Sequence, residues 1–555
     1  MKKILYGISA LVFGLILLLA ALPFVLSADF IEQKVIETVR EQTGRSLTIG
    51  DGTRLSFFPS IGIDLKNVIL SNPPNMGDGE MLQARAIRLN LQLWPLLKKR
   101  IKVDEFILDH PIIALAVDRK GRANWDFSNG ASSSESDGND GQMLLPDDVN
   151  LGDIRIEGGI LGYADARSGT QSILKNIFVS VRLPSLAEAL NMDGRFDWKG
   201  RTINFKSWLK SPKAVMEKQF SPSRLKITTR GMETGFEGNI TLFSGLQANG
   251  SLDFTTPSVR DLAGWLGVQL PTPVGFGAFS MKSRIKWKGS TLALDNFSML
   301  LDGMKAEGAA LVRTGGKRPE IEATLAAGTI NIDTYVGRGS KTASAAPAKA
   351  GWSTAPIDLS GLDAVNADLR LSAARITYGK IKIGKSALAL TLNNGVLKAD
   401  LGELQLYKGR ASGKLTIQGG KRSPAFAAVM STSAVEALPL LSDAADFNWI
   451  SGKAAFSYSV SAQGNTQKKM VSTLKGKGKF SFRNGAIEGI NIAQMFRGLK
   501  KGTLNGWSRA PSAKTDFSIL SGSFKIAKGI VSNSDLKLNG PLVRLSGEGR
   551  VDLPR

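Results

Sequence analysis

The stretch "FSMKSRIKWKG" at residues 279–289 decides which fold the sequence predicts. Apolar and basic side chains alternate along it, as side chains alternate across the two faces of a β-sheet. The stretch therefore predicts a strand with one basic face, which belongs in water, and one apolar face. The apolar face contacts either a second layer of the protein or a guest such as a lipid. Its residues are Phe279, Met281, Ile285 and Trp287.

Similar strand-like runs fill the chain after Gly44, separated by turn signals. Asn-Gly and Asp-Gly pairs suit the tight turns of β-hairpins, because both turn residues need a positive φ. We expect the segments 388–401 and 536–553 to be hairpins or meanders. The predicted body is mainly β and antiparallel, with a few short capping helices. The pairs are Asn249-Gly250, Asp302-Gly303, Asn394-Gly395, Asn484-Gly485 and Asn539-Gly540.

The composition excludes many kinds of active site. The 555 residues contain no cysteine and a single histidine, His110, which precedes a proline and suits a bend between strands. Disulfides, thiolate catalysis, iron–sulfur clusters and zinc sites with several histidines are therefore excluded. A glycan hydrolase would need two positioned carboxylates, and no such pattern is evident. We expect a protein that is not an enzyme and has no cofactor or metal.

The N-terminus predicts a membrane anchor at residues 1–27. Ile4 to Leu26 is a run of 23 residues without charge, about 35 Å of helix against a hydrocarbon core of about 30 Å. A cleavable signal peptide has a shorter apolar region. Lys2 and Lys3 favour a cytoplasmic N-terminus, with the remaining chain in the periplasm of a bacterium. The helix residues include Ile4, Leu15, Leu19 and Leu26.

Two polar stretches predict the organisation of the remaining chain. Residues 129–142 are rich in Ser and Gly, and residues 338–356 are rich in Ala, Ser and Gly, so both read as flexible linkers or loops. They delimit predicted β regions at 28–128, 143–337 and 357–555. The segment 29–44 predicts a short amphipathic helix that ends at Gly44.

The charge distribution favours an anionic partner near the C-terminus. The net charge is +23, and residues 451–555 hold 18 Lys and Arg against five Asp and Glu. This excess is either a solvated strand face or a surface for an anionic membrane or polymer. The periplasmic location argues against nucleic acid. The segment 491–502 predicts a helix that either contacts a membrane surface or caps the sheet. The residues of this helix are Ile492, Met495, Phe496, Leu499, Lys500 and Lys501. The segment 435–449 predicts a similar helix less strongly.

Ordered motifs at both ends resemble the AsmA family of bacterial envelope proteins. At the front these are the anchor, "SNPP" (71–74) and "DRKGRANW" (118–125); at the back they include 404–417, 474–495 and 522–553. By this resemblance, 28–128 is an N-terminal AsmA/chorein-like domain and 357–555 is a C-terminal AsmA-like domain. The family pattern continues with strands beyond "GEGRVDL", whereas this chain stops at Arg555.

The resemblance implies a fold and a function. The family is related to chorein-type bridge-like lipid transfer proteins, whose elongated, curved β-sheets form a hydrophobic groove. The resemblance implies that the protein transfers phospholipid between the inner and outer membranes, and it assigns no catalytic residues. We therefore expect Phe279, Met281, Ile285 and Trp287 to line a lipid groove. The alternative is a periplasmic scaffold or assembly factor for outer-membrane proteins, with a core filled by its own side chains. Expected partners are phospholipids, the inner membrane and envelope proteins.

Overall fold

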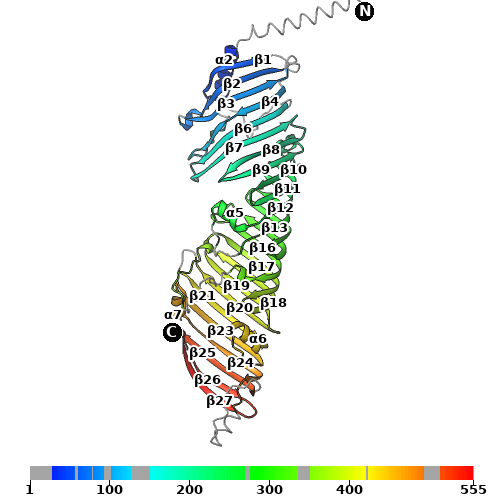
Figure 1. Cartoon of the computed structure of the whole chain (residues 1–555). Helices are drawn as coiled ribbons and strands as arrows, with labels where there is room; N and C mark the ends of the chain where they lie inside the picture. The colour runs from blue at the N-terminus through cyan, green and yellow to red at the C-terminus, as the bar shows by residue number, and fades with distance from the viewer. Residues whose placement is uncertain are drawn as a thin grey trace, which may run out of the picture. The chain divides into compact units, whose positions relative to one another are not determined.

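A computed structural model describes residues 28–56, 60–77, 79–92, 102–126, 150–243, 245–268, 270, 275–335, 351–419, 423–492 and 513–553. The chain divides into two compact units, Met1–Phe254 (unit 1) and Thr255–Arg555 (unit 2). Strands dominate both units, and the strands of each follow one another in chain order (Figure 1). The prediction of a mainly β protein with few helices is confirmed.

Unit 1 begins with the predicted amphipathic helix, α2 (Ala28–Thr43), which packs beside β1 and ends at Gly44 with a φ of +67°. The strands that follow are β1 (Leu47–Ser56), β2 (Ile61–Ser71), β3 (Glu80–Leu91), β4 (Lys102–Asp109), β5 (Ile112–Val117), β6 (Asn150–Asp165), β7 (Thr170–Leu183), β8 (Leu190–Trp198), β9 (Arg201–Leu209), β10 (Ser221–Thr229), β11 (Met232–Thr241) and β12 (Gln247–Thr256). A short helix, α4 (Pro212–Met216), lies between β9 and β10.

Within its described residues, unit 2 has the α-helices α5 (Val259–Leu266), α6 (Ala437–Ala445) and α7 (Gln467–Thr473) and the short 3-10 helices η3 (Ile332–Thr334) and η4 (Ser360–Asp363). Its strands are β13 (Phe279–Lys288), β14 (Thr291–Leu301), β15 (Met304–Arg313), β16 (Glu320–Asn331), β17 (Asn366–Tyr378), β18 (Ile381–Asn393), β19 (Val396–Leu406), β20 (Gly409–Gln418), β21 (Ala425–Ser433), β22 (Val435–Glu436), β23 (Lys453–Gln463), β24 (Lys475–Glu488), β25 (Lys514–Ala527), β26 (Ile530–Asn539) and β27 (Arg544–Asp552).

The predicted antiparallel pairing is only part of the arrangement, because both units also contain parallel pairs. Most neighbours pair antiparallel, but β6 runs parallel to β4 and β5, and β17 runs parallel to β16. A parallel pair needs a connection that returns the chain to the starting end of the strand. The two long connections, between Val117 and Asn150 and between Asn331 and Asn366, are the places where this happens. They include the two stretches predicted as linkers or loops.

The described end of the second connection runs along the ends of the last strands. The Trp352 indole donates to the carbonyl of Leu553 at 2.6 Å. Backbone hydrogen bonds then join Lys468 to Ser353 and Ile357 to Asn465. This segment therefore fastens β17 to strands that are far away in the sequence.

Some of the predicted turns are present, and others lie inside strands. Asp302-Gly303 and Asn394-Gly395 connect β14 to β15 and β18 to β19 with positive φ at both residues, as predicted. The segments 388–401 and 536–553 are hairpins of β18–β19 and β26–β27. Asn249-Gly250 and Asn484-Gly485 instead lie inside β12 and β24, so these two turn predictions are wrong.

A bulged asparagine keeps the apolar side of β14 facing one way. Asn296 has a φ of +49°, and the pairing register shifts beside it on both neighbouring strands. Apolar residues occupy odd positions after the bulge, such as Phe297 and Met299, and even positions before it, at Leu292 and Leu294. An extra residue would otherwise turn half of the strand over.

No helix among the described residues is long and apolar enough to cross a membrane. The predicted anchor, with Ile4, Leu15, Leu19 and Leu26, lies outside the described residues. The predicted curvature of the sheet stays a prediction.

Candidate functional site

The pairing registers of unit 2 place apolar residues directly opposite one another across fourteen strands. Each member of this row is paired with the next, from β13 to β27. At about 4.8 Å between strands, thirteen steps extend for about 60 Å. The row is Ile285, Leu294, Ala310, Ala323, Leu369, Leu390, Ala399, Leu415, Ala428, Val460, Gly476, Ile526, Val531 and Val551.

A second row runs beside the first on the same side of the sheet across β14–β25, two residues away from it on every strand except β14, where the bulge makes the separation three. Neither row contains a charged residue, and the hydroxyl of Tyr458 is the one polar side-chain group in the two rows. Burial raises the pKa of Tyr458. We call this side the apolar face. The second row is Phe297, Gly308, Leu325, Leu371, Leu388, Leu401, Gly413, Met430, Tyr458, Gly478 and Phe524.

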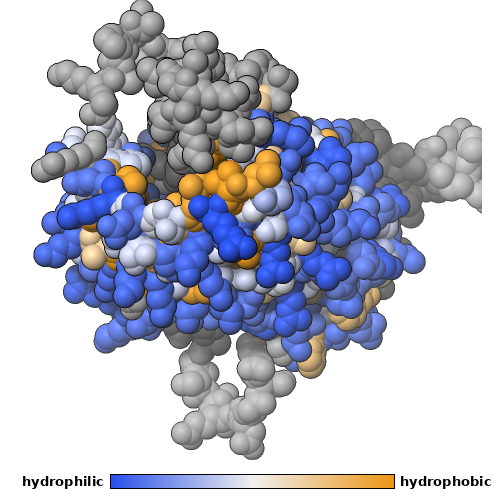
Figure 2. Space-filling model, turned by 90° about the horizontal axis from the view of Figure 1, so that it is seen from below, coloured by the Kyte–Doolittle hydropathy of each residue, from blue (hydrophilic) through white to orange (hydrophobic). Residues whose placement is uncertain are grey.

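The leucines of the apolar face are only half-buried where β17, β18 and β19 meet. Leu369, Leu371, Leu388, Leu390 and Leu401 all keep partial exposure. A second sheet at the usual separation of about 10 Å would bury them almost completely. Within the described residues, therefore, no such layer covers this part of the face. Figure 2, which views the molecule from below Figure 1, shows an area of hydrophobic residues with hydrophilic residues on part of its border.

The opposite side of unit 2, which we call the polar face, carries ion pairs between neighbouring strands. Lys286 Nζ lies 3.1 Å from Asp295 Oδ2, and Arg313 pairs with Glu322 at 2.5 Å. These side chains are largely exposed, so each pair adds little stability. Their effect is to leave one side of the sheet hydrated and the other side free of charge.

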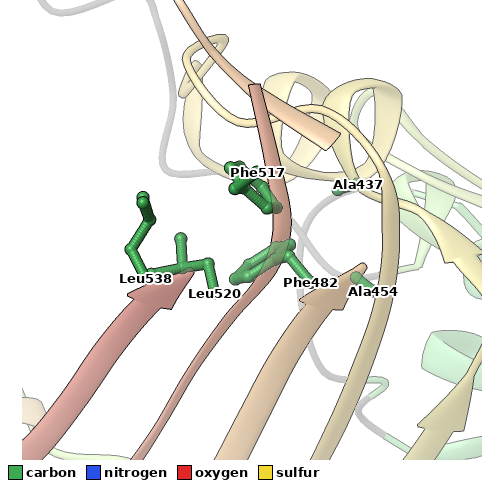
Figure 3. Close-up of a cluster of buried hydrophobic side chains, with 6 residues drawn as sticks. All are labelled: Ala437, Ala454, Phe482, Phe517, Leu520 and Leu538. Atoms are coloured by element: carbon green, nitrogen blue, oxygen red, sulfur yellow. The ribbon is translucent and has the colours of Figure 1, made fainter. Parts of the chain in front are cut away.

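A packed core covers the apolar face at the C-terminal end. Ala437 at the start of α6 packs with residues of β23–β26, and Phe482 and Phe517 lie at its centre (Figure 3). The Phe482 ring meets Phe456 edge-on at a centroid distance of 5.6 Å. The face is therefore filled by the protein's own side chains here but not over β17–β19. The core residues are Ala437, Ala454, Phe482, Phe517, Leu520 and Leu538.

Polar contacts hold α6 at the edge of this core. The Tyr407 hydroxyl donates to Asp443 at 2.7 Å, and Lys380 pairs with Asp446 at 2.5 Å. Burial and the hydrogen bond to Asp443 raise the pKa of Tyr407 to about 12. The segment 435–449, predicted to form a capping or membrane-surface helix, contains α6, and its position against the core is that of a cap.

Unit 1 has an apolar row of the same kind. It crosses ten strands, and Ser207 is its only polar member. The next row on the other side of the sheet contains Arg155, Asp193, Lys206 and Lys226. The apolar row is Leu55, Ile63, Leu89, Phe106, Ile154, Val181, Met192, Ser207, Leu225 and Phe236.

The four residues predicted to line a groove lie on the apolar face but differ in environment. They pair with Leu301, Met299, Leu294 and Leu292 of β14, so the structure gathers them into one patch. Ile285 is buried at 5% exposure, whereas Trp287 is 44% exposed and donates to the carbonyl of Gly289 at 2.7 Å. A role in binding stays a prediction. The better-placed residues are the half-exposed leucines of β17–β19, which single-strand alternation did not distinguish from buried ones.

The helix predicted at 491–502 lies mostly outside the described residues, including Met495, Phe496, Leu499, Lys500 and Lys501. Ile492 is described, and its backbone N–H donates to the Thr515 hydroxyl at 2.9 Å. Contact of this segment with a membrane stays a prediction.

The N-terminal motifs form a buried network of hydrogen bonds rather than a reactive site. Asn124 of "DRKGRANW" is fully buried; it donates to Ala114 O at 2.7 Å and to Asn72 Oδ1 of "SNPP" at 2.8 Å, and it accepts from Ala116 N. Arg45 is also buried and donates to the carbonyl of Asp126 at 2.9 Å. Desolvation lowers the pKa of Arg45.

His110 lies at the bend between β4 and β5, as its position before a proline predicted, with a φ of +47°. Its Nδ1 is 2.7 Å from Asp109, which also accepts two hydrogen bonds from Arg85 at 2.7 and 2.8 Å. Hydrogen bonds from Arg85, and then from His110, lower the pKa of the buried Asp109 to about 2. The group fixes the bend and has the contacts of a structural ion pair.

The sequence of the chain matches the model of the AsmA family over residues 1–250 and 312–536. Comparisons with curated proteins and with solved structures find no match.

Proposed function

Since the chain belongs to the AsmA family, we propose that its apolar face binds phospholipid acyl chains and conducts them along the sheet. The observation that carries the proposal is the uncharged row across β13–β27, whose leucines on β17 and β18 are half-buried. The proposed protein is not an enzyme and moves phospholipid between the inner and outer membranes. Residues 4–26 anchor it in the inner membrane, and the remaining chain lies in the periplasm.

The energetic basis is the transfer of hydrocarbon from water to an apolar surface. Each methylene group exposed to water costs about 0.8 kcal/mol, so a chain of about 16 carbons faces a barrier above about 10 kcal/mol. A continuous apolar surface lowers that barrier at every step and needs no bond chemistry. The absence of charge from both rows of unit 2 matters for the same reason, because a carboxylate or ammonium group would keep water on the path.

Photocrosslinking tests the proposal directly. A photoreactive amino acid at Leu371 or Leu390 places the probe on the apolar face, and the same residue at Arg370 or Ala389 places it on the polar face of the same strands. We expect phospholipid adducts, identified by mass spectrometry of the full-length protein, from the first pair and not from the second. Equal labelling at both pairs, or no lipid at either, would exclude the proposed conduit.

The packed core at the C-terminal end favours a second candidate, a scaffold for envelope proteins, because this part of the face is already filled. A scaffold predicts a stoichiometric protein complex and no copurifying lipid. A lipid conduit predicts bound lipid in the isolated protein. Mass spectrometry of the purified full-length chain separates the two candidates.

A further inference from the structure

The polar face of the last strands differs from the rest of the sheet in its charges. Lys475, Lys477 and Lys479 alternate along β24 and therefore project from one side. Their register partners on β23 are serines: Ser461, Ser459 and Ser457. On β25, Lys477 faces Lys525 and Lys479 faces Ser523. We call the polar side of β23–β27 the basic face.

Some cations elsewhere on this side have acidic partners on a neighbouring strand, as Lys286 has Asp295 and Arg313 has Glu322. In unit 1, Lys226 faces Lys206 in register but lies 2.7 Å from Glu233. Within the described part of unit 2, Lys453 of β23 pairs with Glu436 and Lys514 of β25 pairs with Asp516, but five other lysines of the basic face form no ion pair. Like charges directly opposite one another destabilise a sheet, so an external anion would relieve a repulsion that the fold leaves in place. These lysines are Lys475, Lys477, Lys479, Lys525 and Lys537.

A hollow of about 580 Å³ lies on this face and is lined by hydroxyl and ammonium groups. Lys479 and Lys537 contribute the ammonium groups, and the hydroxyl groups come from Ser457, Ser481, Ser521 and Ser523. Asp535 also lines it, but its carboxylate already accepts from the Ser523 backbone and hydroxyl at 2.7 and 2.8 Å. Ammonium groups beside several hydroxyls match a phosphate that carries a polyol.

Apolar side chains at the margin of the basic face favour a bilayer over a soluble polymer. Leu542, in the turn between β26 and β27, is 76% exposed, and Arg544 begins β27 two residues later. At the same end of these strands, Phe447 and Trp449 stack at a centroid distance of 5.8 Å and keep more than a third of their surface exposed. Trp449 is placed there by the hydrogen bond from Glu488 N to its carbonyl, at 2.8 Å. Exposed apolar tips beside cations suit the interface of an anionic membrane.

From this arrangement we propose that the basic face docks on the surface of an anionic phospholipid bilayer. The lysines of β24 and β25 contact lipid phosphates, and Leu542 enters the headgroup region. The proposal concerns the side opposite to the apolar face, so it holds or fails independently of lipid conduction.

The test measures capture of vesicles by the full-length protein held in a phosphatidylcholine nanodisc. We expect capture of phosphatidylglycerol vesicles and not of phosphatidylcholine vesicles. Capture should decrease when salt is raised from about 0.1 M to about 0.5 M, because exposed charges are screened. The triple variant K475S/K477S/K479S should reduce capture at least about tenfold, given the contribution of each basic residue near an anionic surface.

The matched control is K282S/K286S/K288S, which removes the same charge from the polar face of β13. We expect it to retain capture within about twofold of the original protein. Equal losses in both triple variants would show that net charge alone drives binding and would overturn the proposal. Binding to a purified acidic glycan without capture of phosphatidylglycerol vesicles would also overturn it, in favour of a polymer partner. Circular dichroism of both variants confirms that each is folded.

Discussion

Replacing Leu388 by glutamate tests whether the apolar face is open. Leu388 lies on β18 between Leu371 and Leu401, and all three are half-buried. Full burial of a leucine contributes about 1.5–3 kcal/mol, so losing half of it costs about 1 kcal/mol. On an open face the new carboxylate stays hydrated and adds little to that cost. Under a second layer it would be an unpaired buried charge, and the cost would exceed about 4 kcal/mol.

Hydrogen exchange of the backbone amides of β17–β19 in the full-length chain measures the local free energy of opening. We expect Leu388→Glu to lower it by about 1 kcal/mol and to abolish copurification of lipid. Ala389→Glu, on the polar face of the same strand, is the matched control and should change neither quantity. Collapse of protection across β17–β19 would refute the open face, and unchanged lipid binding would refute its role.

Three further predictions follow from buried groups. Phe482→Ala should lower the free energy of unfolding of unit 2 by about 3–5 kcal/mol, because the ring is 5% exposed in the packed core; a urea midpoint equal to that of the original protein would contradict this. Asn124→Ala should lower the stability of the region around β5 by about 2–3 kcal/mol, because it leaves buried backbone groups without partners. The measurement is the rate of proteolysis near β5, which should rise. An unchanged rate would mean that the hydrogen bonds of Asn124 do not stabilise this region. The pKa of Asp109 falls from 3.8 to about 2 on folding. Its contribution to stability is therefore present above about pH 4 and is lost as the pH falls toward 2, and acid titration of Asp109→Asn should lack this component.

The two faces of the sheet were predictable because alternation is a property of single strands. "FSMKSRIKWKG" gives the apolar and basic sides of β13 correctly. What covers the apolar side was not predictable, because it depends on which strands pair in register and on which helices pack against them. Leu369 and Leu390 become neighbours through β17 and β18, and Phe482 becomes a core residue through α6.

The errors have a common physical origin in asparagine and in long connections. Asparagine accepts a positive φ both in a hairpin turn, as at Asn394, and inside a strand, as at Asn484, and the local sequence looks alike in the two cases. A polar connection equally suits a linker between domains or a return path between parallel strands. The parallel pairing of β16 with β17 shows that this connection is a return path between parallel strands. Only contacts between strands that are distant in sequence reveal such a path.

The bulge at Asn296 has a consequence for how such a sheet can change in length during evolution. Inserting one residue into a strand exchanges inside and outside beyond that point, and a left-handed asparagine cancels the exchange locally. Adding a whole hairpin needs no cancellation, because two new strands in register continue the existing rows. Growth by hairpins therefore extends the apolar face without changing which residues lie on each side, and the length of the sheet can evolve separately from its chemistry.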